Sequence, residues 1–276
     1  MNRLLPAATL LVAALSGCAS MTVASITDIP VNAGQATYII PGDIAGSLTP
    51  AALTARYVAG LRASTGYRTE FVADDTETLI RGVRVAPNQA GGIQVTYLYH
   101  SKLLPLHHDY IADFNLSQTT QGRDVVLNVS CPTSMKDDVS GPNWAGYVKT
   151  EQAVADLRTM CTSTTLKFQQ ADAGELNVNY SDASVYANFA RKLTSYVWDE
   201  RDSTFKKDDI VKFKWFKVED GGITRRVGIT VFPYRNGSKV TYRWVNDVVV
   251  RANGTSNFDP AAAAHMQQLV ASIAND

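Results

Sequence analysis

The stretch ITRRVGITVFPYRNGSKVTYRWVNDVVV, residues 223–250, indicates the fold class more directly than any other part of the chain. Two segments in it, 223–234 and 239–250, are rich in β-branched and aromatic residues that alternate with polar ones. The residues Arg-Asn-Gly-Ser at 235–238 separate them, and Asn-Gly is a strong hairpin signal because both residues tolerate positive φ. The stretch therefore predicts an antiparallel β-hairpin.

Outward from this hairpin, each half of the chain predicts the same order of elements: a strand, a helix, several strands and a closing helix. Thr49-Pro50 and Asp259-Pro260 each supply a helix cap and a first-turn proline, and Asp182 is a third candidate cap. An antiparallel sheet covered by helices satisfies this order, because its apolar face needs such a cover. We therefore predict an α+β fold of two tandem small domains, each an antiparallel sheet covered by helices on one face in a helix-grip-like arrangement.

The predicted domain boundaries follow from changes in composition along the chain. A cluster of polar Thr, Gln, Asp and Gly residues at 163–174 predicts the linker between the two domains. The expected parts are a signal peptide at 1–17, a lipidated cysteine with a flexible tether at 18–35, a first domain at 36–165 and a second domain at 175–276.

The composition excludes several classes of protein. The chain has 276 residues, 45% of them apolar, with 26 basic and 26 acidic side chains. These proportions exclude a disordered chain and a strongly basic nucleic-acid binder. We therefore expect folded domains and no nucleic-acid partner.

The N-terminus predicts an export signal. Arg3 precedes an apolar run from Leu4 to Leu15, which is too short to cross a bilayer core of about 30 Å. The run ends in Leu15-Ser16-Gly17-Cys18, which resembles the lipobox of bacterial lipoproteins. The resemblance implies cleavage before Cys18, a diacylglycerol on its sulfur and an acylated amino group. The alternative is an ordinary cleaved signal with an incidental cysteine.

The lipobox resemblance also implies a location. Lipoproteins retained in the inner membrane tend to carry an aspartate directly after the cysteine, and this chain has Ala19 there. We therefore expect the protein to be lipid-anchored in the outer membrane and to face the periplasm. Two or more lipid chains together form a durable anchor.

Two further cysteines, Cys131 and Cys161, are predicted to form a disulfide. The periplasm is oxidising, and no Cys-x-x-Cys spacing points to a metal site. The alternative is a pair of buried free thiols.

The residues that could carry chemistry are few. His107-His108-Asp109 is the sharpest candidate for metal binding or acid-base work, but neighbours in an extended chain point to opposite faces, so solvated loop residues are the default interpretation. Asp74-Asp75, Asp137-Asp138 and Asp208-Asp209 are interpreted as exposed carboxylates at turns. No Gly-x-Ser-x-Gly elbow or phosphate-binding glycine loop is present. We expect no catalytic residue, no metal and no cofactor.

A basic and aromatic band at 200–251 is the strongest candidate for a binding surface, with 12 basic residues against seven acidic ones. Strand alternation predicts that Phe213 and Trp215 face inward, whereas Lys212 and Lys214 face water. Lys212, Lys214 and Arg226 are therefore the predicted partner-binding residues. The alternative is a solvated sheet face without a partner.

The whole pattern is similar to the two-helix-grip lipoprotein subunit of the outer-membrane β-barrel assembly machine. The matching features are Cys18 in its box, a flexible stretch after it, and helices at 150–162 and 259–274 that close each half, although the tether here is shorter. The resemblance implies a non-enzymatic envelope lipoprotein that binds or scaffolds other envelope proteins.

The alternative function is a periplasmic carrier that holds an apolar ligand such as a lipid between sheet and helix. A cavity of several hundred Å³ lined by Val231, Trp244 and Leu269 favours the carrier, whereas a filled core favours the scaffold.

Overall fold

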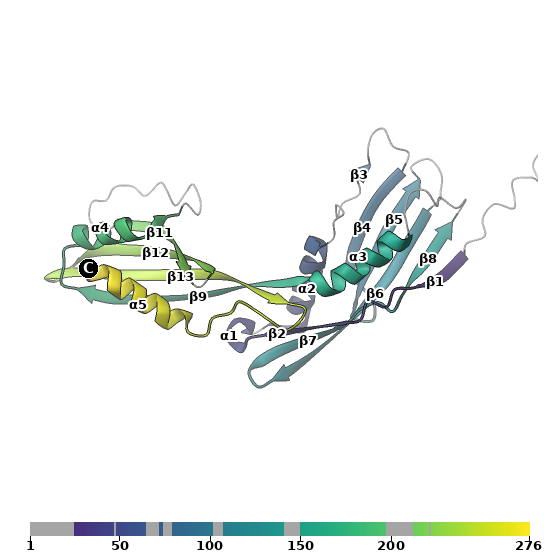
Figure 1. Ribbon diagram of the computed structural model, residues 1–276, viewed down its shortest axis with the longest axis horizontal. Helices are drawn as coiled ribbons and strands as arrows, with labels where there is room; N and C mark the ends of the chain where they lie inside the picture. The colour runs from purple at the N-terminus through teal and green to yellow at the C-terminus, as the bar shows by residue number, and fades with distance from the viewer. Residues whose placement is uncertain are drawn as a thin grey trace, which may run out of the picture. The chain divides into compact units, whose positions relative to one another are not determined.

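The computed structural model (Figure 1) describes residues 25–46, 48–64, 72–73, 79–101, 107–140, 150–196, 212–220 and 222–276. Within them the fold is mixed α+β, with two antiparallel sheets and few helices. No helix in these ranges is both long and apolar enough to cross a membrane. The predicted signal, Cys18, and the pairs Asp74-Asp75 and Asp208-Asp209 lie outside the described residues.

The chain forms two compact units. Of the residues that the structure describes, the first unit contains those up to Ile39, those from 48 to Leu166 and Arg251–Gly254, and the second contains Ile40–Gly46, those from Lys167 to Val250 and Thr255–Asp276. The chain therefore changes unit several times, whereas the sequence predicts a single boundary near 163–174.

The first unit is built on an eight-stranded sheet. Its strands follow the order β1 (Ser25–Pro30), β8 (Ser134–Ser140), β6 (His107–Gln121), β5 (Ile93–Ser101), β4 (Leu79–Pro87) and β3 (Val72–Ala73), while β2 (Gln35–Ile40) pairs with β7 (Asp124–Ser130), which pairs with β6. Its helices are α2 (Pro50–Ser64) and α3 (Thr150–Ser163). The Oγ1 atom of Thr49 accepts a hydrogen bond from the Ala52 amide at 3.2 Å, so the predicted cap and first-turn proline begin α2.

Two strands of this sheet differ from the sequence expectation. β1 lies inside the stretch predicted to be a flexible tether, and β8 contains Asp137-Asp138, predicted to be an exposed turn. The two strands pair with each other in antiparallel register, with Ile29 opposite Met135. Both are short and largely polar, so neither shows the apolar alternation that identifies a strand from local sequence.

The second unit is built on a five-stranded sheet. Its order is β10 (Thr194–Ser195), β11 (Lys212–Asp220), β12 (Ile223–Tyr234), β13 (Gly237–Arg251) and β9 (Thr165–Val178), with helices α1 (Gly42–Ala45), α4 (Asp182–Lys192) and α5 (Ala262–Ala274). The predicted linker at 163–174 is therefore mostly strand, because hydrogen bonding to β13 stabilises β9 despite its polar side chains. The cap of α4 is Ser181, whose side chain accepts from the Ser184 amide, and not Asp182.

The second unit has a packed core to which α4, α5 and four strands contribute. Val231 is 0% exposed and Trp244 is 2% exposed, and both belong to this core. Its other members include Val185 and Phe189 of α4, Met266, Val270 and Ile273 of α5, Val178, Phe216 and Val218 of β9 and β11, and Val227, Ile229, Val240 and Tyr242 of β12 and β13.

Candidate functional site

The pairing register of β11 decides which of its side chains face the core. Phe213 is opposite Thr230 and Trp215 is opposite Gly228, whereas Lys214 is opposite the core residue Ile229. Phe213 and Trp215 therefore lie on the side of the sheet away from the core, and Lys214 lies on the core side. The prediction that Phe213 and Trp215 face inward while Lys214 faces water is wrong, because the two faces of the strand are exchanged.

The predicted set of partner-binding residues does not share one face. Lys212 is opposite Val231 in the register, and the ammonium of Lys214 is 6.0 Å from the centroid of the Phe216 ring. Arg226 is opposite Lys217, on the side of the sheet that carries Trp215. Among the three predicted residues, Arg226 thus lies on a different face from Lys214.

We name the side of this sheet away from the core the outer face. The outer face consists of Phe213, Trp215 and Lys217 of β11, Arg226, Gly228 and Thr230 of β12, and Lys239, Thr241, Arg243, Val245 and Asp247 of β13. These positions alternate with the core residues along each strand.

Trp215 lies across the outer face because its cross-strand neighbour is a glycine. A Cβ atom on Gly228 would be 3.1 Å from Cζ3 of Trp215 and 3.2 Å from Cε2 of Phe213. The two rings meet edge to face, with centroids 5.8 Å apart and planes at 85°. The indole is buried, with 7% of Trp215 exposed.

Arg243 completes this aromatic cluster. Gly228 lies between Trp215 and Arg243 in the register of the three strands. The guanidinium carbon of Arg243 is 4.8 Å from the Trp215 ring centroid and 5.9 Å from that of Phe213. Both distances are within the range of a cation–π interaction.

Two grooves meet at Arg243. One has a volume of about 640 Å³ and is lined by Phe213, Gly228, Thr230, Thr241, Tyr242, Arg243 and residues 173–175 of β9. The other has a volume of about 540 Å³ and is lined by Trp215, Arg243, Trp244, Val245 and residues 171–173. Each volume is in the range of small-molecule sites in proteins, about 300 to 1,000 Å³.

Most cations of the outer face are paired with carboxylates. Lys217 is 2.5 Å from Glu219, Arg226 is 2.9 Å from Asp247, and Lys239 is 2.6 Å from Glu175. The hydrogen bond from Lys217 holds the pKa of the exposed Glu219 carboxyl below its usual value, and a hydrogen bond from Thr224 adds to this effect. Within the described part of the chain, Arg243 has ring contacts and no carboxylate at ion-pair distance.

A buried polar network holds the start of α5 against the sheet. Arg225 is 1% exposed, and its Nη2 atom is 2.5 Å from Oδ2 of Asp259. Gln170 donates to the Asp259 carbonyl at 2.6 Å, and Nδ1 of His265 is 3.4 Å from the Asp259 carboxylate. The sequence predicts Asp259 as a helix cap with Pro260 in the first turn, but α5 begins at Ala262 and its N-cap is Ala261. The sequence signal for the Arg225–Asp259 pair is the place of Arg225 in β12, where strand alternation puts it on the same side as the core residues. A buried arginine needs an acidic partner.

A further cleft lies beside α5. It has a volume of about 480 Å³ and is lined by Val218 and Glu219 of β11 and by residues of α5 that include His265 and Leu269. Val231 and Trp244 do not line this cleft. It is therefore an opening between α5 and β11 and not a cavity within the core.

The histidines predicted to lie in a solvated loop are on strand β6. His108 is 7% exposed, and its Nε2 atom is 2.6 Å from Oδ1 of Asp137 on β8. Tyr110 shares a hydrogen bond of 2.9 Å with the Thr150 hydroxyl, and burial raises the pKa of Tyr110. The exposed-turn interpretation of Asp137 is therefore wrong. No group of three or more His, Cys, Asp and Glu side chains in the described ranges is arranged to hold a metal ion.

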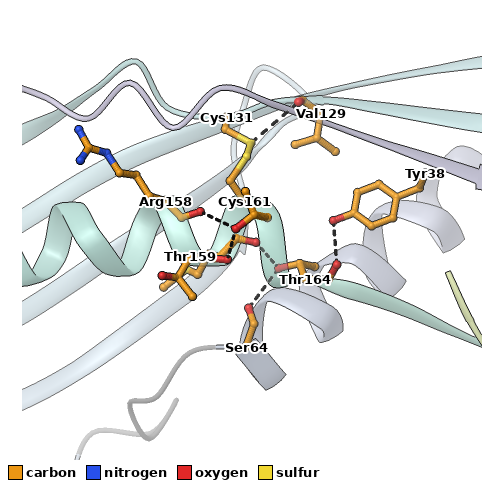
Figure 2. The surroundings of a disulfide bond; sticks show 10 residues. Tyr38, Ser64, Val129, Cys131, Arg158, Thr159, Cys161 and Thr164 are labelled. Atoms are coloured by element: carbon orange, nitrogen blue, oxygen red, sulfur yellow. Dashed lines mark hydrogen bonds between the residues drawn. A yellow bond between two sulfur atoms is a disulfide. The ribbon is translucent and has the colours of Figure 1, made fainter. Parts of the chain in front are cut away.

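Cys131 and Cys161 are joined by a disulfide in the first unit, shown in Figure 2. The bond links the residue that follows β7 to the last turn of α3, with Cα atoms 6.0 Å apart, and both cysteines are buried. Nearby, Thr164 donates to the Met160 carbonyl at 2.6 Å, and its own carbonyl accepts from the Tyr38 hydroxyl at 3.1 Å. The disulfide thus lies beside a hydrogen-bonded junction at the end of α3.

Comparison with protein-family models and with curated proteins finds no match. Among solved structures, the chain is similar to the crystal structure of DynU16, a protein from the dynemicin biosynthetic locus. The sequence identity is 12%, the match covers 92% of this chain and 95% of that chain, and the TM-score is 0.18. A similarity at this level supports no statement about fold or function.

Proposed function

We propose that this protein is a non-enzymatic lipoprotein of the cell envelope that binds other envelope components through the outer face of its second unit. The observation that carries the proposal is the pair of grooves, about 640 and 540 Å³, that meet at Arg243 beside Trp215 and Phe213. Grooves with aromatic walls and a few polar groups are the usual form of a binding site.

The proposed lipid anchor and the proposed cellular location rest on the N-terminal sequence. The lipobox at Leu15–Cys18 favours lipid attachment at Cys18, and Ala19 favours the outer membrane with the domains in the periplasm. A protein held at a membrane surface by its lipid can present a sheet face to partners without a second anchor.

The proposed arrangement of each unit is helix-grip-like, with helices on one face of an antiparallel sheet. In the second unit, Phe189 of α4 and Met266 of α5 share a core with Ile229 of β12, which supports this arrangement. It leaves the opposite face of the sheet for binding, in keeping with the scaffold role implied by the resemblance to the assembly-machine subunit.

The carrier hypothesis receives weaker support. The cleft of about 480 Å³ contains Val218 and Leu269, but polar groups including Glu219 and His265 share its walls. Val231 is packed in the core at 0% exposure, and Trp244, at 2% exposure, also lines the groove of about 540 Å³, but neither Val231 nor Leu269 lines that groove. A filled core favours a binding module over a carrier.

Site-specific photo-crosslinking in intact cells tests the proposal. A photoreactive residue at Thr241 on the outer face should capture an envelope protein, whereas one at the exposed Gln267 of α5 should not. Thr230→Arg, which places a large side chain in the groove, should reduce capture from Thr241. Ala264→Arg is the matched control, because it adds the same side chain at an exposed position of α5. Equal capture from both positions, or none from Thr241, would contradict the proposal.

A further inference from the structure

We propose that Arg243 is an anion-binding residue and that the larger groove beside it takes a ligand with a carboxylate or phosphate group on an apolar or ring-shaped body. This inference rests on the proposed binding role of the outer face and names the chemistry that the face recognises. Three observations on Arg243 carry it: its charge environment, its stacking and the walls of the grooves.

The charge environment distinguishes Arg243 from its neighbours. Lys217, Arg226 and Lys239 each have a carboxylate within 2.5 to 2.9 Å. Arg243 is exposed and, among the described residues, interacts with rings and not with an acid. Its five N–H donors therefore remain available, and their fork geometry matches carboxylate and phosphate oxygens.

Stacking holds the guanidinium in position before a ligand arrives. It lies 4.8 Å from the Trp215 ring centroid and 5.9 Å from that of Phe213, and the edge-to-face contact fixes the two rings. Gly228 permits this arrangement, since a Cβ atom there would approach both rings to 3.1–3.2 Å. A cation held in its binding geometry loses less conformational entropy when an anion binds.

The walls of the larger groove suit an anion. Glu175, the acidic residue of the larger groove, pairs with Lys239, whereas Asp172 lines only the smaller groove, where its carboxylate accepts from the Ala173 amide at 2.7 Å. Thr230 and Thr241 add hydroxyl donors to the larger groove. Ala173 and Gly174 of β9 also line this groove, and the Tyr242 side chain fills the space beside Gly174, where a Cβ atom would be 2.4 Å from the Tyr242 hydroxyl. An oxyanion in the larger groove would thus meet the Arg243 guanidinium and neutral donors, whereas the Asp172 carboxylate disfavours an anion in the smaller groove.

Binding of small probes to the mature chain with Cys18→Ser tests the inference. The probes are 3-phenylpropionate, phenyl phosphate and the uncharged 3-phenylpropionamide. Their binding is measured by calorimetry and by the shifts of the tryptophan indole NMR signals. At least one anion should bind about tenfold or more tightly than the amide, because charge-assisted bonds to arginine are stronger than neutral ones. Arg243→Gln should reduce anion binding to the level of the amide, and Arg243→Lys should restore it only in part.

The matched control is Arg235→Gln, which removes a different arginine that also stacks on a ring, 5.1 Å from the centroid of Tyr234, at a site away from the grooves. This variant should bind the anions as the parent chain does. Vesicles with phosphatidylglycerol, compared with vesicles of phosphatidylcholine alone, separate a lipid headgroup from a free organic anion as the source. An Arg243-dependent preference for the former supports a lipid phosphate, and binding of the soluble probes alone supports a small molecule.

The inference is overturned if the amide binds as tightly as both anions, if no probe binds, or if Arg243→Gln changes nothing. Its failure can be distinguished from failure of the proposed function. Capture from Thr241 that persists in Arg243→Gln while no anion binds would show that the outer face has a partner but does not recognise an oxyanion. If Thr241 captures no envelope protein in the parent chain, the proposed function itself is contradicted.

Discussion

A Cβ atom on Gly237 would lie 2.0 Å from the backbone carbonyl oxygen of Val178, so the β12–β13 hairpin and the end of β9 approach more closely than any side chain permits. The sequence interpretation assigns Gly237 to the turn because glycine tolerates positive φ. Tyr234 pairs with Gly237, however, so the turn residues are Arg235 and Asn236, and Arg235 has a φ of 53°. Gly237 is needed for close approach and not for the turn.

Gly237→Ala should therefore destabilise the second unit. The clash involves backbone on both sides, which cannot rotate away, and we expect a loss of about 1 to 3 kcal/mol, as for other overpacking substitutions. Urea unfolding followed by tryptophan fluorescence measures it. Arg235→Asn is the comparison variant and should keep or raise stability, because asparagine adopts positive φ more readily. An unchanged unfolding midpoint for Gly237→Ala would contradict the close approach.

Reduction of the Cys131–Cys161 disulfide should destabilise the first unit. The cysteines are 30 residues apart, and the chain-entropy model gives about 3 to 4 kcal/mol for a loop of this size. Intact mass after alkylation of the unfolded Cys18→Ser chain should show no labelled thiol before reduction and two after it. Two labels without reduction would show that the bond does not form.

Cys18→Ser should leave the protein unprocessed or release it from the membrane fraction. The thioether to diacylglycerol needs the sulfur of Cys18, and serine has none. Cell fractionation with mass analysis of the N-terminus measures the effect. A variant that matures normally and still sediments with membranes would eliminate the lipoprotein hypothesis.

Alkaline pH should destabilise the first unit through two buried tyrosines. The rings of Tyr38 and Tyr57 are 5.8 Å apart, and burial raises the pKa of both hydroxyls. Their folded pKa values exceed the unfolded value of about 10, so their contribution is complete below that pH and is lost as pH rises above it. Thermal unfolding from pH 8 upward should show the loss.

Tyr57→Phe should make this pH dependence shallower, because it removes one of the buried hydroxyls whose pKa is raised. Tyr234→Phe is the control, since Tyr234 is 37% exposed and belongs to the second unit. If Tyr57→Phe and the parent chain lose stability over the same pH range and to the same extent, the buried tyrosines do not control the transition.

A fragment that begins at Lys167 should fold better than one that begins at Glu175, the predicted start of the second domain. The longer fragment keeps the part of β9 that belongs to the second unit, whereas the shorter one leaves much of the β13 edge without its neighbour. Dispersed amide resonances and a cooperative thermal transition identify the folded fragment. Disorder in the longer fragment would show that the second unit does not fold alone.

The sequence predicts those strands best whose partners lie next to them along the chain. The predicted 223–234 coincides with β12, and 239–250 lies within β13, because a hairpin shows both its alternation and its turn locally. The two antiparallel sheets of the mixed α+β fold follow from the same pattern. The sequence does not predict β1, β8 or most of β9 as strands, since pairing with strands distant in sequence stabilises them and their own side chains are largely polar.

The candidate site was only partly predictable, for a reason visible in β11. Its odd positions carry Phe213 and Trp215 before two charged residues, and its even positions carry two lysines before Phe216 and Val218. Each face therefore has the same balance, and local alternation cannot choose between them. The register against β12 makes the choice, and a shift by one residue exchanges the two faces.

The positions of Cys131 and Cys161 along the chain also determine the order in which the molecule can mature. Both cysteines precede β9, whereas β11, β12 and β13, which build the second core, come later. Translation and export deliver a chain from its N-terminus, and domains delivered first generally fold first. Both cysteines are therefore present before the strands of the second core, so the disulfide can form before that core is complete.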